Sequence, residues 1–228
     1  MSGLVIAVDG PAAAGKGTLA RRLAAALNLA HLDTGNLYRA VAARLLEEGV
    51  SAEDVERATR VAAELQVQDL ERADLRTERV GQVASRVSAY PEVRAALLEF
   101  QRRFAKEPPE GRAGAILDGR DIGTVVCPDA PIKLFVTASL EARARRRHEE
   151  LLARGEPTIY AHVLAEMEAR DTRDRDRLVA PLRAASDAVT LDTTNLSADE
   201  VFAAAMAVVA EKSGHSKASV RSGTVEQY

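Results

Sequence analysis

The sequence of 228 residues contains no tryptophan and one cysteine, and aromatic residues make up only 4% of it. A single cysteine excludes an intrachain disulfide. Cys127 is followed by Pro128 and has no activating group near it in the sequence, which predicts a small buried apolar residue rather than a catalytic thiol. No apolar run approaches the roughly 20 residues that span a bilayer, and no charged leader precedes the first apolar segment. We therefore expect a cytoplasmic protein that does not act at a membrane.

The sequence also lacks a strong excess of either charge. Its formal net charge of -3 and its isoelectric point near 5.9 disfavour a general nucleic-acid binder. With 46% hydrophobic and 29% charged residues, it has the composition of a globular domain. Only five of the 31 basic residues are lysines. Arginine forms forked hydrogen bonds to phosphate, although a codon bias would produce the same composition.

A glycine-bounded segment near the N-terminus predicts a phosphate-binding loop. An apolar run at residues 4–8 leads into it, and the four-residue spacing of Leu19, Leu23 and Leu27 predicts an amphipathic helix after it. Glycines let successive N–H groups turn toward a polyphosphate, and the helix N-terminus adds partial positive charge. The alternative is a glycine turn without a ligand. The predicted nucleotide-binding residues are Gly10, Pro11, Ala12, Ala13, Ala14, Gly15, Lys16, Gly17 and Thr18.

Apolar runs of strand length alternate with helical patterns along the rest of the chain. The runs lie at residues 4–8, 31–33, 115–118, 132–136 and 189–192. Strands that alternate with helices predict an α/β fold, in which a central, mainly parallel sheet lies between two helical layers.

Helical patterns predict two additions to this sheet and a final helix. They fill residues 36–112, including a long amphipathic stretch at 91–105, and they form a charged pair at 140–154 and 160–177 that we interpret as a mobile lid. We predict one domain over residues 1–212, with a core of about 1–35, 113–140 and 178–212, a lobe at 36–112 and the lid at 141–177. A last helix at 197–212 precedes a polar segment, 213–228, that we expect to be disordered.

Two polar segments follow predicted strands, where open α/β sheets bind their ligands. In the first, Asp33-Thr34-Gly35-Asn36-Leu37-Tyr38-Arg39, a ring and a forked cation begin a helix and can face a nucleotide. The alternative is that Thr34 or Asn36 only caps that helix. In the second, Asp118-Gly119-Arg120-Asp121-Ile122-Gly123-Thr124, Arg120 suits a phosphate and Asp121 can accept a hydrogen bond from an exocyclic amine such as that of cytosine. A surface turn with an Arg-Asp ion pair is the alternative there.

An arginine-rich run occupies residues 170–177 of a predicted helix. Arg170, Arg173, Asp174 and Arg177 are three or four residues apart and share one face. Like charges at this spacing repel unless an anion joins them, so we interpret the face as an anion site. The alternative is a solvated helix stabilised by pairs such as Asp171 with Arg175.

Taken in order, these segments resemble the bacterial cytidylate kinases over about residues 4–200. The phosphate loop is common to nucleoside monophosphate kinases, whereas the stretch from Asp118 to Val126 and the arginine-rich helix make the resemblance specific. The resemblance implies a P-loop kinase fold with a core, a helical NMP-binding lobe and a lid. It also implies ATP-dependent phosphorylation of CMP and dCMP to CDP and dCDP, with Mg²⁺. We expect a monomer whose partners are these small molecules.

The resemblance further assigns roles by position. It implies cytosine recognition by Ser85, Arg94 and Asp121, of which the first two otherwise have the pattern of surface residues on amphipathic helices. The implied sugar and phosphate contacts are Thr34, Tyr38, Arg39, Arg120, Arg170, Asp174 and Arg177. The chain departs from the family pattern by a shorter segment near 67–79 and by a longer one between 94 and 118 that includes Pro108-Pro109.

A phosphate acceptor needs no general base, because its second pKa is near 6 and it is largely a dianion at neutral pH. We accordingly interpret the four histidines as structural or surface residues. We expect the closed lid to surround the transferring phosphoryl group with four catalytic cations, Lys16, Arg120, Arg173 and Arg177.

The sequence pattern does not assign roles to two further arginines or side-chain ligands to a metal ion. Arg143 and Arg147, one turn apart, are either lid contributors or solvated residues. Because Gly17 separates Lys16 from Thr18, Mg²⁺ is expected to be held mostly by nucleotide phosphates and water, and no side chain is assigned as its ligand.

The phosphate loop is also compatible with two rival functions. The first is a kinase of the same fold that acts on another acceptor. The second is a nucleotide-dependent switch, against which the chain shows no Asn-Lys-x-Asp segment for guanine.

Overall fold

The computed structural model describes residues 3–221, with side chains described to residue 214. Five parallel strands form one sheet in the order β2-β3-β1-β4-β5. The strands are β1 (Leu4–Asp9), β2 (Ala30–Asp33), β3 (Gly114–Gly119), β4 (Ile132–Thr137) and β5 (Val189–Asp192). Each predicted strand is present, and the α/β fold with a parallel sheet is confirmed.

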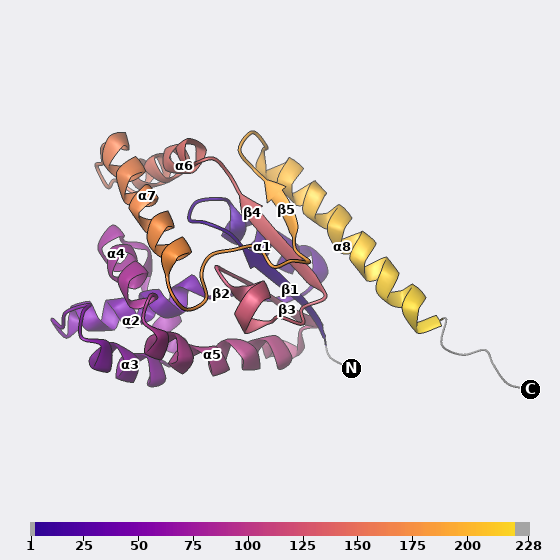
Figure 1. Ribbon diagram of the computed structural model, residues 1–228, viewed down its shortest axis with the longest axis horizontal. Coiled ribbons are helices and arrows are strands. Elements are labelled where there is room, and N and C mark those ends of the chain that lie inside the picture. The colour runs from indigo at the N-terminus through magenta and orange to yellow at the C-terminus, as the bar shows by residue number, and fades with distance from the viewer. Residues whose placement is uncertain (1–2, 222–228) are drawn as a thin grey trace, which may run out of the picture.

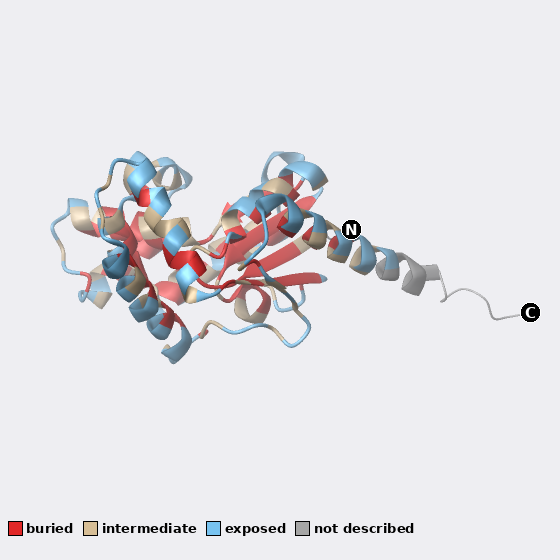
Figure 2. Cartoon of the chain, turned by 90° about the horizontal axis from the view of Figure 1, so that it is seen from above, coloured by how far each residue is buried: buried red, intermediate tan, exposed pale blue. Residues whose placement is uncertain are grey.

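Alternating side chains of the strands bury the two faces of the sheet in separate cores. Ile6 and Val8 point to the face covered by α1 (Lys16–Leu27) and α8 (Ala198–Arg221), which contribute Leu23 and Ala205 to that core. Ala7 points to the opposite core, which contains residues of α2 (Gly35–Glu47) and α5 (Pro91–Lys106). Figure 1 shows α8 alongside β4 and β5, and Figure 2 shows the buried residues concentrated in the strands. The sheet is therefore the middle of three layers.

The predicted lobe at residues 36–112 is helical. It comprises α2, α3 (Val55–Ala63), α4 (Glu78–Val87) and α5, with 3-10 turns at Val67–Glu71 and Ala73–Arg76 in the segment that departs from the family pattern. Its helices begin at capping residues: Asp54 accepts from the Arg57 N–H at 2.9 Å, and Pro91 occupies the first turn of α5. The Pro108-Pro109 segment forms a short turn at Pro109–Gly111.

The predicted lid is a helical hairpin of α6 (Leu140–Ala153) and α7 (Tyr160–Asp176). Ser139 caps α6 by accepting from the Ala142 N–H at 3.2 Å. The hairpin has its own small apolar core, against which the phosphate loop packs. That core contains Ala144, Leu151, Val163 and Met167.

Two expectations from the sequence need correction. The final helix does not end at residue 212 but continues to Arg221, so the expected disorder is wrong for residues 213–221, and residues 222–228 lie outside the described residues. Cys127 is half-buried rather than buried, although burial still raises the pKa of its thiol to about 11. That value agrees with a thiol that takes no part in catalysis.

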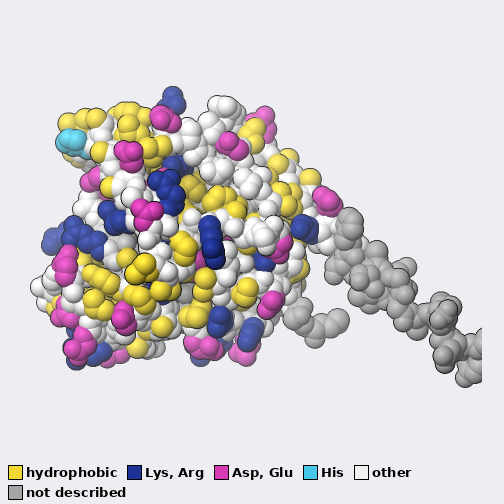
Figure 3. All heavy atoms as spheres, viewed as in Figure 1, with side chains coloured by type: hydrophobic (Ala, Val, Ile, Leu, Met, Phe, Trp, Pro, Cys, Tyr) yellow, Lys and Arg dark blue, Asp and Glu magenta, His cyan; other side chains and the backbone are white. Residues whose placement is uncertain are grey.

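The surface carries mixed charge. On the face in Figure 3, acidic and basic side chains are interspersed, in keeping with the net charge of -3. No helix among residues 3–221 is long and apolar enough to span a bilayer.

Candidate active site

The segment between β1 and α1 forms the predicted loop. Gly10 and Gly15 have φ values of 147° and 91°, which side chains other than glycine rarely adopt. A Cβ at Gly10 would also overlap the carbonyl oxygen of Val136 on β4. The loop therefore depends on glycine at this position for both its conformation and its contact with the sheet.

Lys16, the first residue of α1, is buried beneath this loop. Its ammonium donates a hydrogen bond to the Pro11 carbonyl at 2.8 Å. Burial, followed by repulsion from Arg120, lowers its pKa from 10.5 to about 7. Lys16 is consequently only about half protonated at neutral pH, and an anionic ligand would return it to the charged form.

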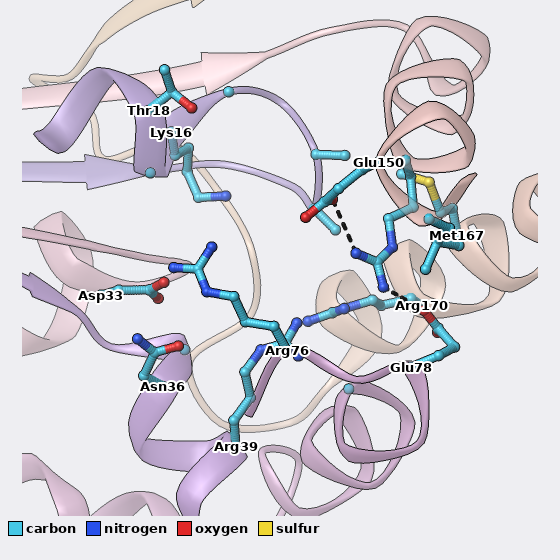
Figure 4. Close-up of a pocket in the computed structure, with 18 of the residues that line it drawn as sticks. Lys16, Thr18, Asp33, Asn36, Arg39, Arg76, Glu78, Glu150, Met167 and Arg170 are labelled. Atoms are coloured by element: carbon cyan, nitrogen blue, oxygen red, sulfur yellow. Dashed lines mark hydrogen bonds and ion pairs between the residues drawn. The ribbon is translucent and has the colours of Figure 1, made fainter. Parts of the chain in front are cut away.

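A cavity of about 280 Å³ opens beside the loop, between the core and the lid. Figure 4 shows Lys16, Asp33, Asn36 and Arg39 along one side, with Glu150 of α6 and Met167 of α7 along the other. Cationic side chains outnumber carboxylates in its lining. The cavity therefore suits a polyanion.

Arg170 of α7 lines this cavity and a second one of about 60 Å³. Its Nε is buried and has no hydrogen-bond partner among the described residues. Burial, with Arg120 as the next cause, lowers the pKa of this guanidinium to about 10. Burial likewise lowers the pKa of Arg39, which donates to the Leu75 carbonyl at 2.9 Å. Both cavities are thus lined by a cation whose buried Nε has no hydrogen-bond acceptor among the described residues.

The second cavity is small and lies beside the lobe at 36–112, which contributes part of its lining. Arg94 of α5 forms a buried ion pair with Asp121, which follows β3, and its guanidinium lies 5.5 Å from the centre of the Tyr38 ring. Arg177 Nη2 is 3.7 Å from Asp121 Oδ1 and has no hydrogen-bond partner. Arg120 donates from Nε to Asp174 Oδ2 at 2.8 Å. A slot of this kind offers donors and an acceptor to one flat polar ligand.

Most of the predicted substrate-binding residues gather around this second cavity. Thr34 does not cap α2 with its side chain, and its hydroxyl donates to the Asp118 carbonyl at 2.8 Å. Asp121 pairs with Arg94 rather than with its neighbour Arg120, so the surface-turn alternative is wrong. The residues that line the cavity include Thr34, Tyr38, Arg39, Arg94, Arg120, Asp121, Arg170, Asp174 and Arg177.

Two predicted site residues lie elsewhere. Arg173 donates to the Ser85 hydroxyl at 3.2 Å, and neither residue lines either of these cavities. This contact instead joins α7 of the hairpin to α4 of the lobe at 36–112. Three arginines were expected at the site on this face of α7. Arg170 and Arg177 line the second cavity, and Arg173 does not.

The hairpin of α6 and α7 contacts the lobe at 36–112 through further polar side chains. Arg147 pairs with Glu78 at the start of α4 and with Glu150 at 3.0 Å. Arg154 donates to the Arg76 carbonyl at 2.9 Å. A hydrogen bond of 2.9 Å from Gln82 to Glu166 completes these inter-lobe contacts. Arg147 lines the larger cavity, as expected of a lid contributor.

Arg143 and Asp171 behave differently from the expectation. Asp171 is 5% exposed and pairs with Arg143 of α6 at 2.6 Å, so the surface pair with Arg175 is wrong. Arg143 is equally buried and does not line the larger cavity.

Asp9 is a site residue that the sequence interpretation missed. Its two carboxylate oxygens accept from the Ile122 and Gly123 N–H groups, both at 2.7 Å, and so hold the π-helical turn at Ile122–Val126. Burial raises the pKa of Asp9 to about 6, although these two hydrogen bonds act to lower it. The one available signal was a carboxylate at the end of an apolar strand.

Two further carboxylates lie at the strand ends below the loop. Asp33 and Asp118 are register partners on β2 and β3. Burial and the charge of Asp118 raise the pKa of Asp33. His31 Nε2 lies 2.7 Å from Asp118 Oδ2, so this histidine supports the site from behind, consistent with a structural role.

Comparison with known proteins identifies the family. A family model described as cytidylate kinase matches residues 6–211. The chain is 58% identical to the cytidylate kinase of Paramagnetospirillum magneticum, over 91% of this chain and 98% of the relative. It is 59% identical to that of Methylobacterium sp., over 90% and 96%, and 52% identical to that of Rhodospirillum rubrum, over 92% and 99%. The resemblance seen in the four sequence segments is therefore confirmed: this chain belongs to the cytidylate kinase family.

Proposed function

We propose that this chain catalyses the ATP-dependent phosphorylation of CMP and dCMP to CDP and dCDP. Family membership supports a kinase that acts on cytidine nucleotides. The observation that supports the site best is Arg170, whose buried Nε has no hydrogen-bond partner among the described residues and which lines both cavities. A buried donor without an acceptor is unfavourable, and an acceptor phosphate at this point would satisfy it.

In this proposal ATP occupies the larger cavity. The loop from Gly10 to Thr18 surrounds its β- and γ-phosphates, with the N-terminus of α1 and Lys16 directed at the same oxygens. Because the empty site lowers the pKa of Lys16 to about 7, phosphate oxygens would restore its charge on binding.

The acceptor occupies the second cavity, with its base between Tyr38, Arg94 and Asp121. The Asp121 carboxylate can accept from the exocyclic amine of cytosine, and Arg94 can donate to the ring acceptors. Uracil presents a carbonyl in place of that amine, so the Asp121 carboxylate would face another acceptor. Ser85 would contribute to base recognition only after release from Arg173.

Transfer then consists of alignment and charge neutralisation. The acceptor phosphate is already mostly a dianion, so it attacks the γ-phosphorus without a general base. Arg120 lines both cavities, Lys16 lines the larger one, and Arg177 lines the second one, where the acceptor would bind. Arg173 donates to the Ser85 hydroxyl, so it would have to leave this contact in order to join these cations when the lid closes further.

The residues beside the loop fit a phosphate-bound Mg²⁺. Asp33 and Asp118 and the Thr18 hydroxyl are oxygen donors in the cavity lining. No group of three or more His, Cys, Asp or Glu side chains in the described part of the chain forms a complete metal site. These side chains would hold Mg²⁺ beside the nucleotide, and the ion would supply positive charge that reduces the charge of the ATP phosphates.

We further propose a monomeric, cytoplasmic enzyme that acts on small molecules rather than on nucleic acid or membranes. The lobe at 36–112 would bind the acceptor and the hairpin at 141–177 would act as its lid.

A coupled ADP-release assay with Mg-ATP and, in parallel, CMP, dCMP, UMP, AMP and GMP tests the function. We expect CMP and dCMP to lead, and turnover led by another acceptor would refute the cytosine assignment. Asp121→Asn should lower the preference for CMP over UMP by about tenfold or more, because the amide offers a donor to the uracil carbonyl. An unchanged CMP-to-UMP ratio in this variant would remove Asp121 from base recognition.

A further inference from the structure

The guanidinium of Arg143 joins three separate segments. It donates from Nε to the Ala138 carbonyl at 2.9 Å, from Nη1 to the Ala12 carbonyl of the phosphate loop at 3.3 Å, and from Nη2 to Asp171 Oδ2 at 2.6 Å. Both charged residues are 5% exposed. One buried cation on α6 therefore connects the loop that would hold the donor to the helix α7.

Asp171 is buried on α7 but does not take part in either cavity. Its neighbour Arg170 lines both cavities, and Asp174 binds Arg120 in the second cavity, whereas Asp171 lines neither cavity. A rotation or shift of α7 would move Arg170 and Asp174 together. The contact with Arg143 fixes the helix against such a movement.

The apolar surroundings reinforce the same connection. Ala12 and Ala13 of the loop pack against the small core of the hairpin that includes Ala144 of α6 and Met167 of α7. These contacts are short and non-directional, so they hold the loop near the hairpin without fixing the angle of α7. The directional bonds of Arg143 supply that constraint.

We propose that the Arg143–Asp171 ion pair is a positioning device that couples the phosphate loop to α7, so that the bound donor and the acceptor phosphate lie in register. Arg143 and Asp171 touch neither nucleotide and act through the Ala12 carbonyl and through Arg170. This inference rests on the proposed function.

The two partners should affect the two substrates differently. In Asp171→Asn, Arg143 keeps its bonds to Ala12 and Ala138 while α7 loses its charged anchor. The KM for CMP should then rise about tenfold and kcat should fall, with the affinity for an ATP analogue changed by less than about threefold. In Arg143→Lys, a single ammonium cannot replace three forked contacts, so the affinities for both nucleotides should fall.

The decisive measurement is the thermodynamic coupling between the two sites. Calorimetry gives the affinity for CMP with and without a non-hydrolysable ATP analogue, and the ratio of the two affinities should fall toward one in both variants. Asp176→Asn and Arg145→Lys are matched controls, because both residues are exposed on the same helices. A purely structural pair would lower the urea midpoint and leave KM and coupling of the folded enzyme unchanged.

A buried charge that loses its partner destabilises a protein, so a second variant covers poor folding of Asp171→Asn. The double variant Arg143→Met with Asp171→Leu buries no charge and is expected to fold. It should show the same loss of coupling. The inference is overturned if Asp171→Asn, or the double variant in its place, matches wild type in KM and coupling while wild type phosphorylates CMP. A wild type that phosphorylates no acceptor would instead overturn the proposed function.

Discussion

Replacing Arg170 by methionine should stabilise the ligand-free enzyme while weakening acceptor binding. Arg170 is charged at neutral pH in the folded and unfolded states, but folding lowers its pKa to about 10. A base with a lowered folded pKa is disfavoured in its charged form, so the charge opposes folding at every pH below 10. Methionine retains an apolar stem in place of the arginine methylenes and removes the charge.

The size of this effect follows from the pKa. The fall of the Arg170 pKa to about 10 corresponds to about 3 kcal/mol of unfavourable free energy at about 1.36 kcal/mol for each tenfold change in acidity. Arg170 is in part exposed to the cavity, where water screens its charge, so we expect a gain of about 1–2 kcal/mol in the free energy of unfolding. A charge-assisted bond to phosphate contributes about 1.5–3 kcal/mol, so the affinity for CMP should fall about 10- to 100-fold.

Urea unfolding with and without CMP, together with kcat/KM, measures both effects. The variant should unfold at a higher urea concentration than wild type without ligand, and added CMP should protect it much less. Arg175→Met is the control, since Arg175 is exposed on the same helix. A variant that is less stable than wild type, and that CMP still protects fully, would show that Arg170 is not an unpaired anion-binding cation.

Two other predictions concern protonation. At pH 8, ATP binding should take up close to one proton, because the pKa of Lys16 is about 7 in the empty site and phosphate restores its charge; calorimetry in buffers of different ionisation enthalpy measures the uptake, which should vanish at pH 6 and in Lys16→Met. Cys127, whose pKa rises from 9.0 to about 11, should react with iodoacetamide at pH 8 roughly a hundredfold more slowly than a free thiol, and unfolding in urea should restore the rate.

The features that the sequence predicted well are those set by local pattern. The strand-loop-helix around Lys16, the hairpin at 140–177 and the strand ends that carry Asp33 and Asp121 follow from apolar periodicity, glycine positions and the rule that parallel strands end at one edge. Arg170 and Arg177 were found because repulsion between stacked arginines indicates a missing anion.

The features that it could not predict depend on which distant side chains meet. Spacing alone predicts an ion pair between Asp171 and Arg175. The packing of α7 against α6 instead pairs Asp171 with Arg143, and no local signal in the sequence distinguishes these outcomes. The same holds for Asp9, whose partners lie more than a hundred residues away. Arg173 faces Ser85 because the arrangement of lid and lobe, rather than helical periodicity, decides which of its neighbours it reaches.

The inter-lobe contacts bear on how products leave. The pair of Arg147 with Glu78 and the bonds of Arg154 and Gln82 are partly exposed to water, and contacts of this kind contribute about 0–1 kcal/mol each. The hairpin keeps its own core, against which only Ala12 and Ala13 of the described phosphate loop pack. Its contacts with the lobe at 36–112 are thus weak and screened, and raising the ionic strength should shorten the residence time of ADP and CDP without disturbing the sheet below.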